Sequence, residues 1–222
     1  MSETLPLFPL GTVLYPGLLL PLHIFEDRYR QLVRDLLAES GPRHFGVIAI
    51  RRGRETGVDG ISALHEIGCI ATLRQVTEHD DGGFDLVTVG TQRFRLLELD
   101  DSQPYLQGEV DLLADDAGDE SAAAVAAEAV RRGFLGYLEA LSQRGVTQVA
   151  APDLPAEPVL LSYLVAASMI IELSDRQALL AEPDAVSRLT AERALLHRET
   201  TMLQSLTSTP APDLRYSPYN PN

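Results

Sequence analysis

The sequence changes its hydrophobic pattern once, and this change limits the fold more than any other feature. Before Ala114 the apolar residues form short runs between turn residues, as in Ile67–Glu78 and Phe84–Gly90, which is typical of β-strands. After Glu120 they recur at helical spacing. The acidic, glycine-containing segment Ala114–Glu120 between these two parts indicates a linker. We therefore expect an α+β chain in which a β-rich part precedes a helical part.

The β-rich part contains six apolar runs bounded by turn residues. The predicted strands are Leu18–Ile24, Phe45–Arg51, Ile67–Glu78, Phe84–Gly90, Phe94–Leu99 and Leu106–Leu112. One helix is predicted among them, over Glu26–Ala38, where the apolar residues have helical spacing. The paired glycines of His79–Gly83 predict a hairpin turn, since glycine readily adopts positive φ.

In the helical part, a first helix is predicted to run to about Arg144, and Pro158–Ile171 has the length of a buried helix rather than of a membrane span. Ser174 and Gln177 form a capping-box pattern. The last predicted helix begins at Pro183 and carries leucines at heptad spacing, Leu189, Leu196 and Leu203. The predicted parts are a β-rich subdomain 1–114, a helical bundle 119–207 and a Pro/Ser-rich tail 208–222.

Composition excludes several functions. The formal net charge is −14, which repels phosphate backbones and anionic lipid, so general nucleic-acid or membrane binding is not expected. All 18 basic residues counted as Lys or Arg are arginines. A phosphate-loop ATPase, a Ser-Lys peptidase or a Schiff-base enzyme therefore cannot be built from this sequence. The single cysteine, Cys69, suits a reducing cytoplasm, and neither a cofactor motif nor a metal-binding motif is recognised.

Several segments, in order, resemble the N-terminal substrate-binding domain of the Lon protease family. These segments are Leu5–Gly11, Val13–Gly17, Leu20–Glu26 with Arg28 and Tyr29, Glu66–Ala71, Gly90–Leu96, Pro104–Leu106, Ala166–Ser168 and Arg176–Leu180. The resemblance implies a PUA-like mixed β pseudo-barrel with one helix, followed by an α-helical bundle. It also implies a non-enzymatic, cytoplasmic module of bacterial type that binds unfolded polypeptide or a partner protein, without ATPase or peptidase parts. A role in protein quality control or as an adaptor would follow.

We expect the polypeptide to bind near the junction of the two subdomains. The candidate contact residues are Tyr15, Pro16, Leu18, Phe25, Tyr29, Arg93 and Arg95. The loop at Pro16 either offers an edge for an extended peptide or only bends the chain. The two arginines flank Phe94, so alternation places both on the face opposite its ring, where they either clamp a carboxylate or form an internal ion pair.

Two other classes of function remain open at this point. In the first, the β-rich part is an enzyme or binder for a small molecule or RNA, and Arg93, Arg95 or a histidine takes part. Separately, the basic loop of Arg51, Arg52 and Arg54 either contacts RNA or only solvates a hairpin. In the second, the leucine stripe of the last helix mediates self-association, including a homodimer. His65 and Cys69 are four residues apart but lie in a strand pattern, so the sequence favours an interior cysteine over a metal site.

Overall fold

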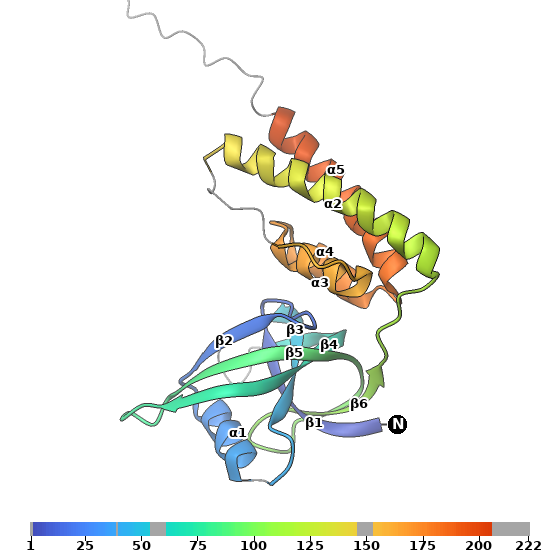
Figure 1. Ribbon diagram of the computed structural model, residues 1–222. Helices are drawn as coiled ribbons and strands as arrows, with labels where there is room; N and C mark the ends of the chain where they lie inside the picture. Colours follow the sequence, from blue (N-terminus) through green and yellow to red (C-terminus); the bar gives the residue numbers. More distant parts are fainter. Residues whose placement is uncertain (1, 39, 54–60, 146–152, 206–222) are drawn as a thin grey trace, which may run out of the picture.

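The computed structural model describes residues 2–38, 40–53, 61–145 and 153–205 and shows two groups of elements (Figure 1). The strands are β1 (Ser2–Leu10), β2 (Leu19–Ile24), β3 (His44–Gly53), β4 (Ile61–Glu78), β5 (Phe84–Asp100) and β6 (Gln107–Leu113), with helix α1 (Asp27–Ala38) after β2. The later helices are α2 (Glu120–Gln143), α3 (Pro158–Ser168), α4 (Leu173–Ala181) and α5 (Ala185–Ser205). We call β1–β6 with α1 the sheet subdomain, and α2–α5 the helical subdomain. The predicted tail 208–222 lies outside the described residues.

The strands form one mixed sheet in the order β2-β5-β4-β3-β1-β6, and β6 also pairs with β5. β1 is parallel to β3, whereas all other pairings are antiparallel. The sheet curls because long strands change partner along their length. β5 pairs with β2 through its first half and with β6 through its second half. The fold is therefore the predicted mixed pseudo-barrel, and it is not a closed barrel.

Helix α1 forms where the sequence predicts it, because its apolar residues recur on one face. Tyr29, Leu32, Val33 and Leu36 are buried and pack against Phe8, Phe45 and Phe84 of the sheet. A second apolar cluster inside the curled sheet surrounds Phe94. The predicted strands at Phe84–Gly90 and Phe94–Leu99 are one continuous strand, β5, and the N-terminal strand β1 had not been predicted.

In the helical subdomain, α2 and α5 pack along each other, and α3 and α4 lie between this pair and the sheet (Figure 1). Leu189 and Leu196 of the predicted stripe are buried, and Leu203 is half-buried against the same cluster. The stripe is thus covered within one chain, which argues against self-association through it. No helix in the described ranges combines the length and the apolar character that a membrane span requires.

The capping-box prediction was wrong. Helix α4 begins two residues earlier than the capping box predicts, with Glu172 as its N-cap residue and no side-chain capping bond. Ser174 therefore lies inside the helix. The Gln177 side chain instead donates a hydrogen bond to the backbone oxygen of Ile67 in β4, at 2.8 Å. Gln177, which the sequence pattern predicts to cap its own helix, thus forms a contact between the two subdomains.

Candidate functional site

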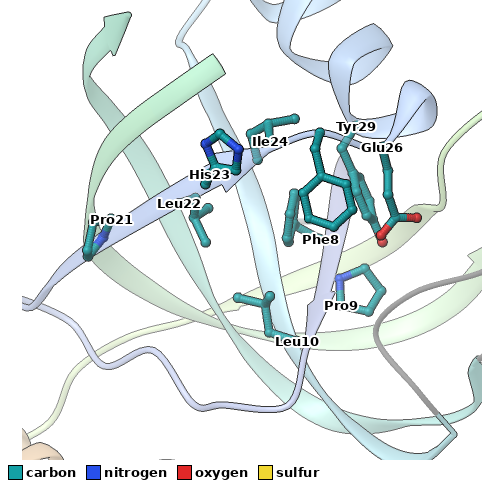
Figure 2. Close-up of a pocket in the computed structure, with 10 residues that line it drawn as sticks. Phe8, Pro9, Leu10, Pro21, Leu22, His23, Ile24, Glu26 and Tyr29 are labelled. Atoms are coloured by element: carbon teal, nitrogen blue, oxygen red, sulfur yellow. The ribbon is translucent and has the colours of Figure 1, made fainter. Parts of the chain in front are cut away.

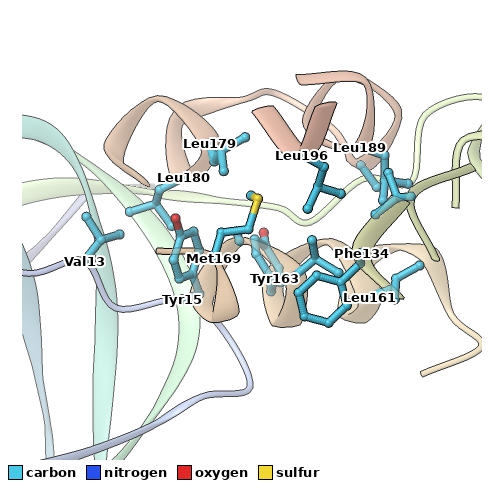
Figure 3. Packing of buried hydrophobic residues seen from close by; sticks show 14 of the residues in the cluster. Val13, Tyr15, Phe134, Leu161, Tyr163, Met169, Leu179, Leu180, Leu189 and Leu196 are labelled. Atoms are coloured by element: carbon cyan, nitrogen blue, oxygen red, sulfur yellow. The ribbon is translucent and has the colours of Figure 1, made fainter. Parts of the chain in front are cut away.

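The predicted contact residues divide between two places, and the first of these is the junction of the subdomains. Here Tyr15 is 1% exposed and packs with Val13 against Leu180 and other residues of the helical subdomain (Figure 3). Its hydroxyl donates a hydrogen bond to the backbone oxygen of Arg176 at 2.8 Å. Burial raises the pKa of this hydroxyl far above its ordinary value. Tyr15 therefore holds the two subdomains together.

Arg93 is the polar centre of the same junction. It is 2% exposed, and its Nη1 donates to the backbone oxygen of Leu180 at 3.0 Å. Further donations reach the backbone oxygens of Glu182 and Pro183, and Nε pairs with the Asp115 carboxylate at 3.2 Å. Of the two alternatives predicted for Arg93, the structure therefore shows the internal ion pair. Because its donors already have partners within the chain, Arg93 is not free to clamp a carboxylate of a client.

A second buried cation, Arg188, lies near Arg93. Its guanidinium lies over the ring of Tyr163, 4.2 Å from the ring centre, and donates to the Ser162 hydroxyl at 3.0 Å. Tyr163 donates to the carboxylate of Asp115, and burial raises the pKa of the Tyr163 hydroxyl. These groups form a buried polar network that is satisfied by its own members. Such a network fixes a unique packing.

Beside the junction lies a groove of about 370 Å³, lined by Arg51, His65, Gln177 and Ala181 among others. Partial burial, and then the charge of Arg51, lower the pKa of His65. Arg51 of this lining and its neighbour Arg52 are exposed, whereas Arg54 lies outside the described residues. The groove is open and mixed in character, and it contains neither of the two predicted arginines of β5.

The second place is an apolar groove between the unpaired edges of β1 and β2, which we call the seam groove (Figure 2). It exists because the end of β1, from Leu7 to Leu10, pairs with β3 on one side, whereas β2 pairs with β5. The two strands face each other without a ladder between them. The groove has a volume of about 220 Å³ and is lined by Phe8, Pro9, Leu10, Pro21, Leu22, His23, Ile24, Phe25, Glu26 and Tyr29.

Aromatic rings form the end of the seam groove that lies toward α1. Phe8 and Tyr29 stack with ring centres 4.1 Å apart, and the Arg28 guanidinium lies 4.6 Å from the centre of the Tyr29 ring. Arg28 is in turn paired with Glu26 at 2.9 Å. Phe25, at the rim, is 56% exposed. Burial of this large exposed ring would be the main contribution of the site to the free energy of binding.

Prolines interrupt both edges of the seam groove. Pro9 in β1 and Pro21 in β2 have no N–H to donate, and proline on an edge strand hinders unwanted strand pairing. A bound peptide would therefore meet carbonyl acceptors and apolar side chains rather than a complete ladder of donors. Leu19, the first residue of β2, does not line the groove but is 67% exposed.

The structure places the seven predicted residues as follows. Phe25 and Tyr29 line the seam groove; Leu18 is half-buried between the apolar clusters of the two subdomains; Tyr15, Pro16 and Arg93 are buried; and Arg95 is exposed on β5. The lining residues Phe8, Pro9 and Leu22 had not been predicted. The signal for Phe8 and Pro9 in the sequence was the run Leu5–Leu10, an apolar strand pattern that contains two prolines, and Leu22 lies in the predicted strand Leu18–Ile24.

Comparison with known proteins places this fold in a family. The model of the ATP-dependent protease La (LON) substrate-binding domain matches residues 4–198. Lon protease 2 of Myxococcus xanthus is 29% identical over 215 residues, which are 92% of this chain and 24% of the relative. Lon protease of Escherichia coli strain K12 is 25% identical over 203 residues, or 90% of this chain and 25% of the relative. The chain thus spans about a quarter of the length of these relatives.

Solved structures agree with this placement. The Lon N-terminal domain protein from Xanthomonas campestris has a TM-score of 0.60 and 25% identity, over 94% of this chain and 99% of its own. The N-terminal domain of Mycobacterium avium complex Lon protease has the same TM-score at 18% identity, over 90% of this chain and 98% of its own, and so supports the fold alone. The chain belongs to the family of the Lon substrate-binding domain.

Proposed function

We propose that this protein is a non-catalytic module that binds segments of unfolded polypeptide, or of a partner protein, in the seam groove. The observation that carries the proposal is the exposed ring of Phe25 at the rim of a groove lined mainly by apolar side chains. Large exposed apolar groups around a groove mark interaction sites. A role in cytoplasmic protein quality control, or as an adaptor, is part of the same proposal, and membership of the family supports it.

The size and charge of the groove fit this class of ligand. Small-molecule sites usually have volumes of about 300–1,000 Å³, whereas the seam groove has about 220 Å³ and is open to solvent. It can take one or a few side chains of a longer chain. The net charge of −14 favours apolar or basic segments over acidic ones.

The alternative of an enzyme acting at the sheet subdomain is less well supported. Such a site should contain a titratable group with a strongly shifted pKa. Burial raises the pKa of Cys69 and of Glu192, but Cys69 lies in the sheet core and Glu192 lies in the helical subdomain. Neither residue lines the seam groove or the groove beside the junction.

The test is the affinity for a fluorescein-labelled, permanently unfolded polypeptide, measured by fluorescence anisotropy with the wild type and with Phe25→Ser. Burial of a phenylalanine contributes about 1.5–3 kcal/mol, so we expect Kd to rise about tenfold or more in the variant. Because Phe25 is mostly exposed, the fold should be retained, which circular dichroism checks.

Leu135→Ser is the matched control, since Leu135 is 46% exposed on α2, away from the seam groove. Its Kd should equal that of the wild type, and labelled single-stranded RNA should not bind. An equal increase in Kd for both variants would show that the polypeptide does not bind in the seam groove. Binding of RNA but not of polypeptide would overturn the proposal.

A further inference from the structure

Two histidines and an aspartate meet on the exposed face beside the seam groove. His23 in β2 is the direct cross-strand partner of Asp85 in β5. His79 follows β4, two residues after Thr77, and Thr77 is the partner of Asp85 on the other side. The His79 ring reaches the Asp85 carboxylate from this position just beyond the strand. The backbone pairing of three strands therefore brings together three side chains that are far apart in sequence.

The three side chains are in direct contact, and their potential ligand atoms lie close together. Nδ1 of His23 lies 2.7 Å from one oxygen of the Asp85 carboxylate, and Nε2 of His79 lies 2.8 Å from the other. One candidate ligand atom from each residue lies within 4.8 Å of those of the other two.

The hairpin that carries His79 is closed by its own hydrogen bonds. The His79 N–H donates to the backbone oxygen of Gly83, and the Gly82 N–H donates back to the His79 oxygen, each at 2.9 Å. Gly82 has φ of +77°, which a side chain would disfavour. His79 is thus held by a defined turn, and a preorganised ligand binds a metal with a smaller loss of conformational entropy.

We propose that His23, His79 and Asp85 bind a divalent transition-metal ion of the Zn²⁺ class. Two imidazole nitrogens and a carboxylate oxygen are ligands that Zn²⁺ accepts, and a site with three protein ligands leaves a position for water or an external group. Calcium and magnesium prefer oxygen ligands alone and fit this set poorly. Each neutral ring would offer the ion the nitrogen that faces Asp85 and carry its proton on the other ring nitrogen.

The site would act on the seam groove directly, because His23 also lines that groove. A bound ion would link β2 to the hairpin that follows β4 and so restrict the motion of the groove rim. Phe25 lies at this rim, and its ring centre is 6.2 Å from that of His23. In the described part of the chain this is the one group of three such residues with metal-binding spacing. Cys69 does not compete for the metal, since it is buried.

Isothermal titration calorimetry of the untagged, chelator-treated protein with zinc sulfate tests the proposal. We expect one ion per chain with a micromolar Kd, and a loss of affinity of at least tenfold in His79→Gln and in Asp85→Asn. His197→Gln, which alters an exposed histidine on α5, is the control and should bind like the wild type. Circular dichroism shows whether each variant is folded.

Two results would overturn the proposal. One is the absence of saturable heat with zinc up to millimolar concentration in the folded wild-type protein. The other is zinc binding that the His79 and Asp85 variants leave unchanged, which would place the ion elsewhere. Because polypeptide is absent from the titration, neither result bears on the function proposed for the seam groove.

Discussion

Arg93 and Arg95 show how the same residue type, two positions apart in one strand, acquires two different roles. The alternation of β5 places Phe94 in the sheet core, whereas Arg93 contacts the helical subdomain. Arg95 lies farther along the strand and is exposed. Sequence alone could predict that the arginines oppose Phe94, and that an ion pair was one option. It could not identify Asp115 as the partner, because tertiary packing brings the two together.

Replacing Arg93 by methionine should destabilise the protein by about 3 kcal/mol. The change leaves the Asp115 carboxylate and the backbone oxygens of Leu180, Glu182 and Pro183 without their donor. Urea denaturation followed by circular dichroism measures the free energy of unfolding. Arg95→Met is the matched control and should change it by no more than about 0.5 kcal/mol. Equal effects of the two substitutions would contradict the role given to Arg93.

At the scale of elements, the sequence predicted best where one face of an element is buried. Helix α1 and most of the strands follow that pattern. The continuity of β5 was missed because Gly90 suggested a break, yet this glycine is needed where another segment passes close to the strand. A Cβ atom at Gly90 would lie 2.2 Å from the backbone oxygen of Tyr15. The Gly90 N–H also donates to the backbone oxygen of Leu18.

Alanine should therefore have opposite effects at two glycines. Gly90→Ala forces the segment at Tyr15 away from β5 and should cost about 1–3 kcal/mol of stability. Gly136→Ala, on an exposed turn of α2 with nothing within 4 Å of the added methyl group, should instead stabilise the protein by about 0.5–1 kcal/mol. Thermal denaturation of both variants measures the difference. A tolerated Gly90→Ala would mean that the segment is loosely held.

For the whole molecule, the sequence predicted the α+β class, the order of its parts and the family. It did not predict the seam groove or the group around Asp85, because both depend on which strands pair and in which register. His23 and Asp85 are neighbours through β2–β5 pairing alone. The junction was expected to be an open binding surface, whereas Tyr15 and Arg93 fill it. The subdomain limits at 114 and 119 stay a proposal.

The stability of the whole chain should depend on pH through one buried carboxyl group. Glu192 on α5 is 0% exposed, and neither of its carboxylate oxygens has a hydrogen-bond partner within the described residues. Burial raises its pKa well above the ordinary 4.5, and the nearby charge of Arg188 opposes this only in part. The folded state thus holds the Glu192 proton more tightly than the unfolded state does.

Well below pH 4.5 both states are protonated at Glu192, and the stability of the fold does not change with pH through this group. As the pH rises above that value, ionisation favours the unfolded chain, so the folded protein loses stability until its own raised pKa is passed. Glu192→Gln cannot ionise, and its stability relative to the wild type should therefore rise between acidic and neutral pH. Urea denaturation across this range measures the difference, and the exposed Glu128→Gln is the control. A constant difference between wild type and Glu192→Gln would show that Glu192 stays ionised in the fold, paired with Arg188.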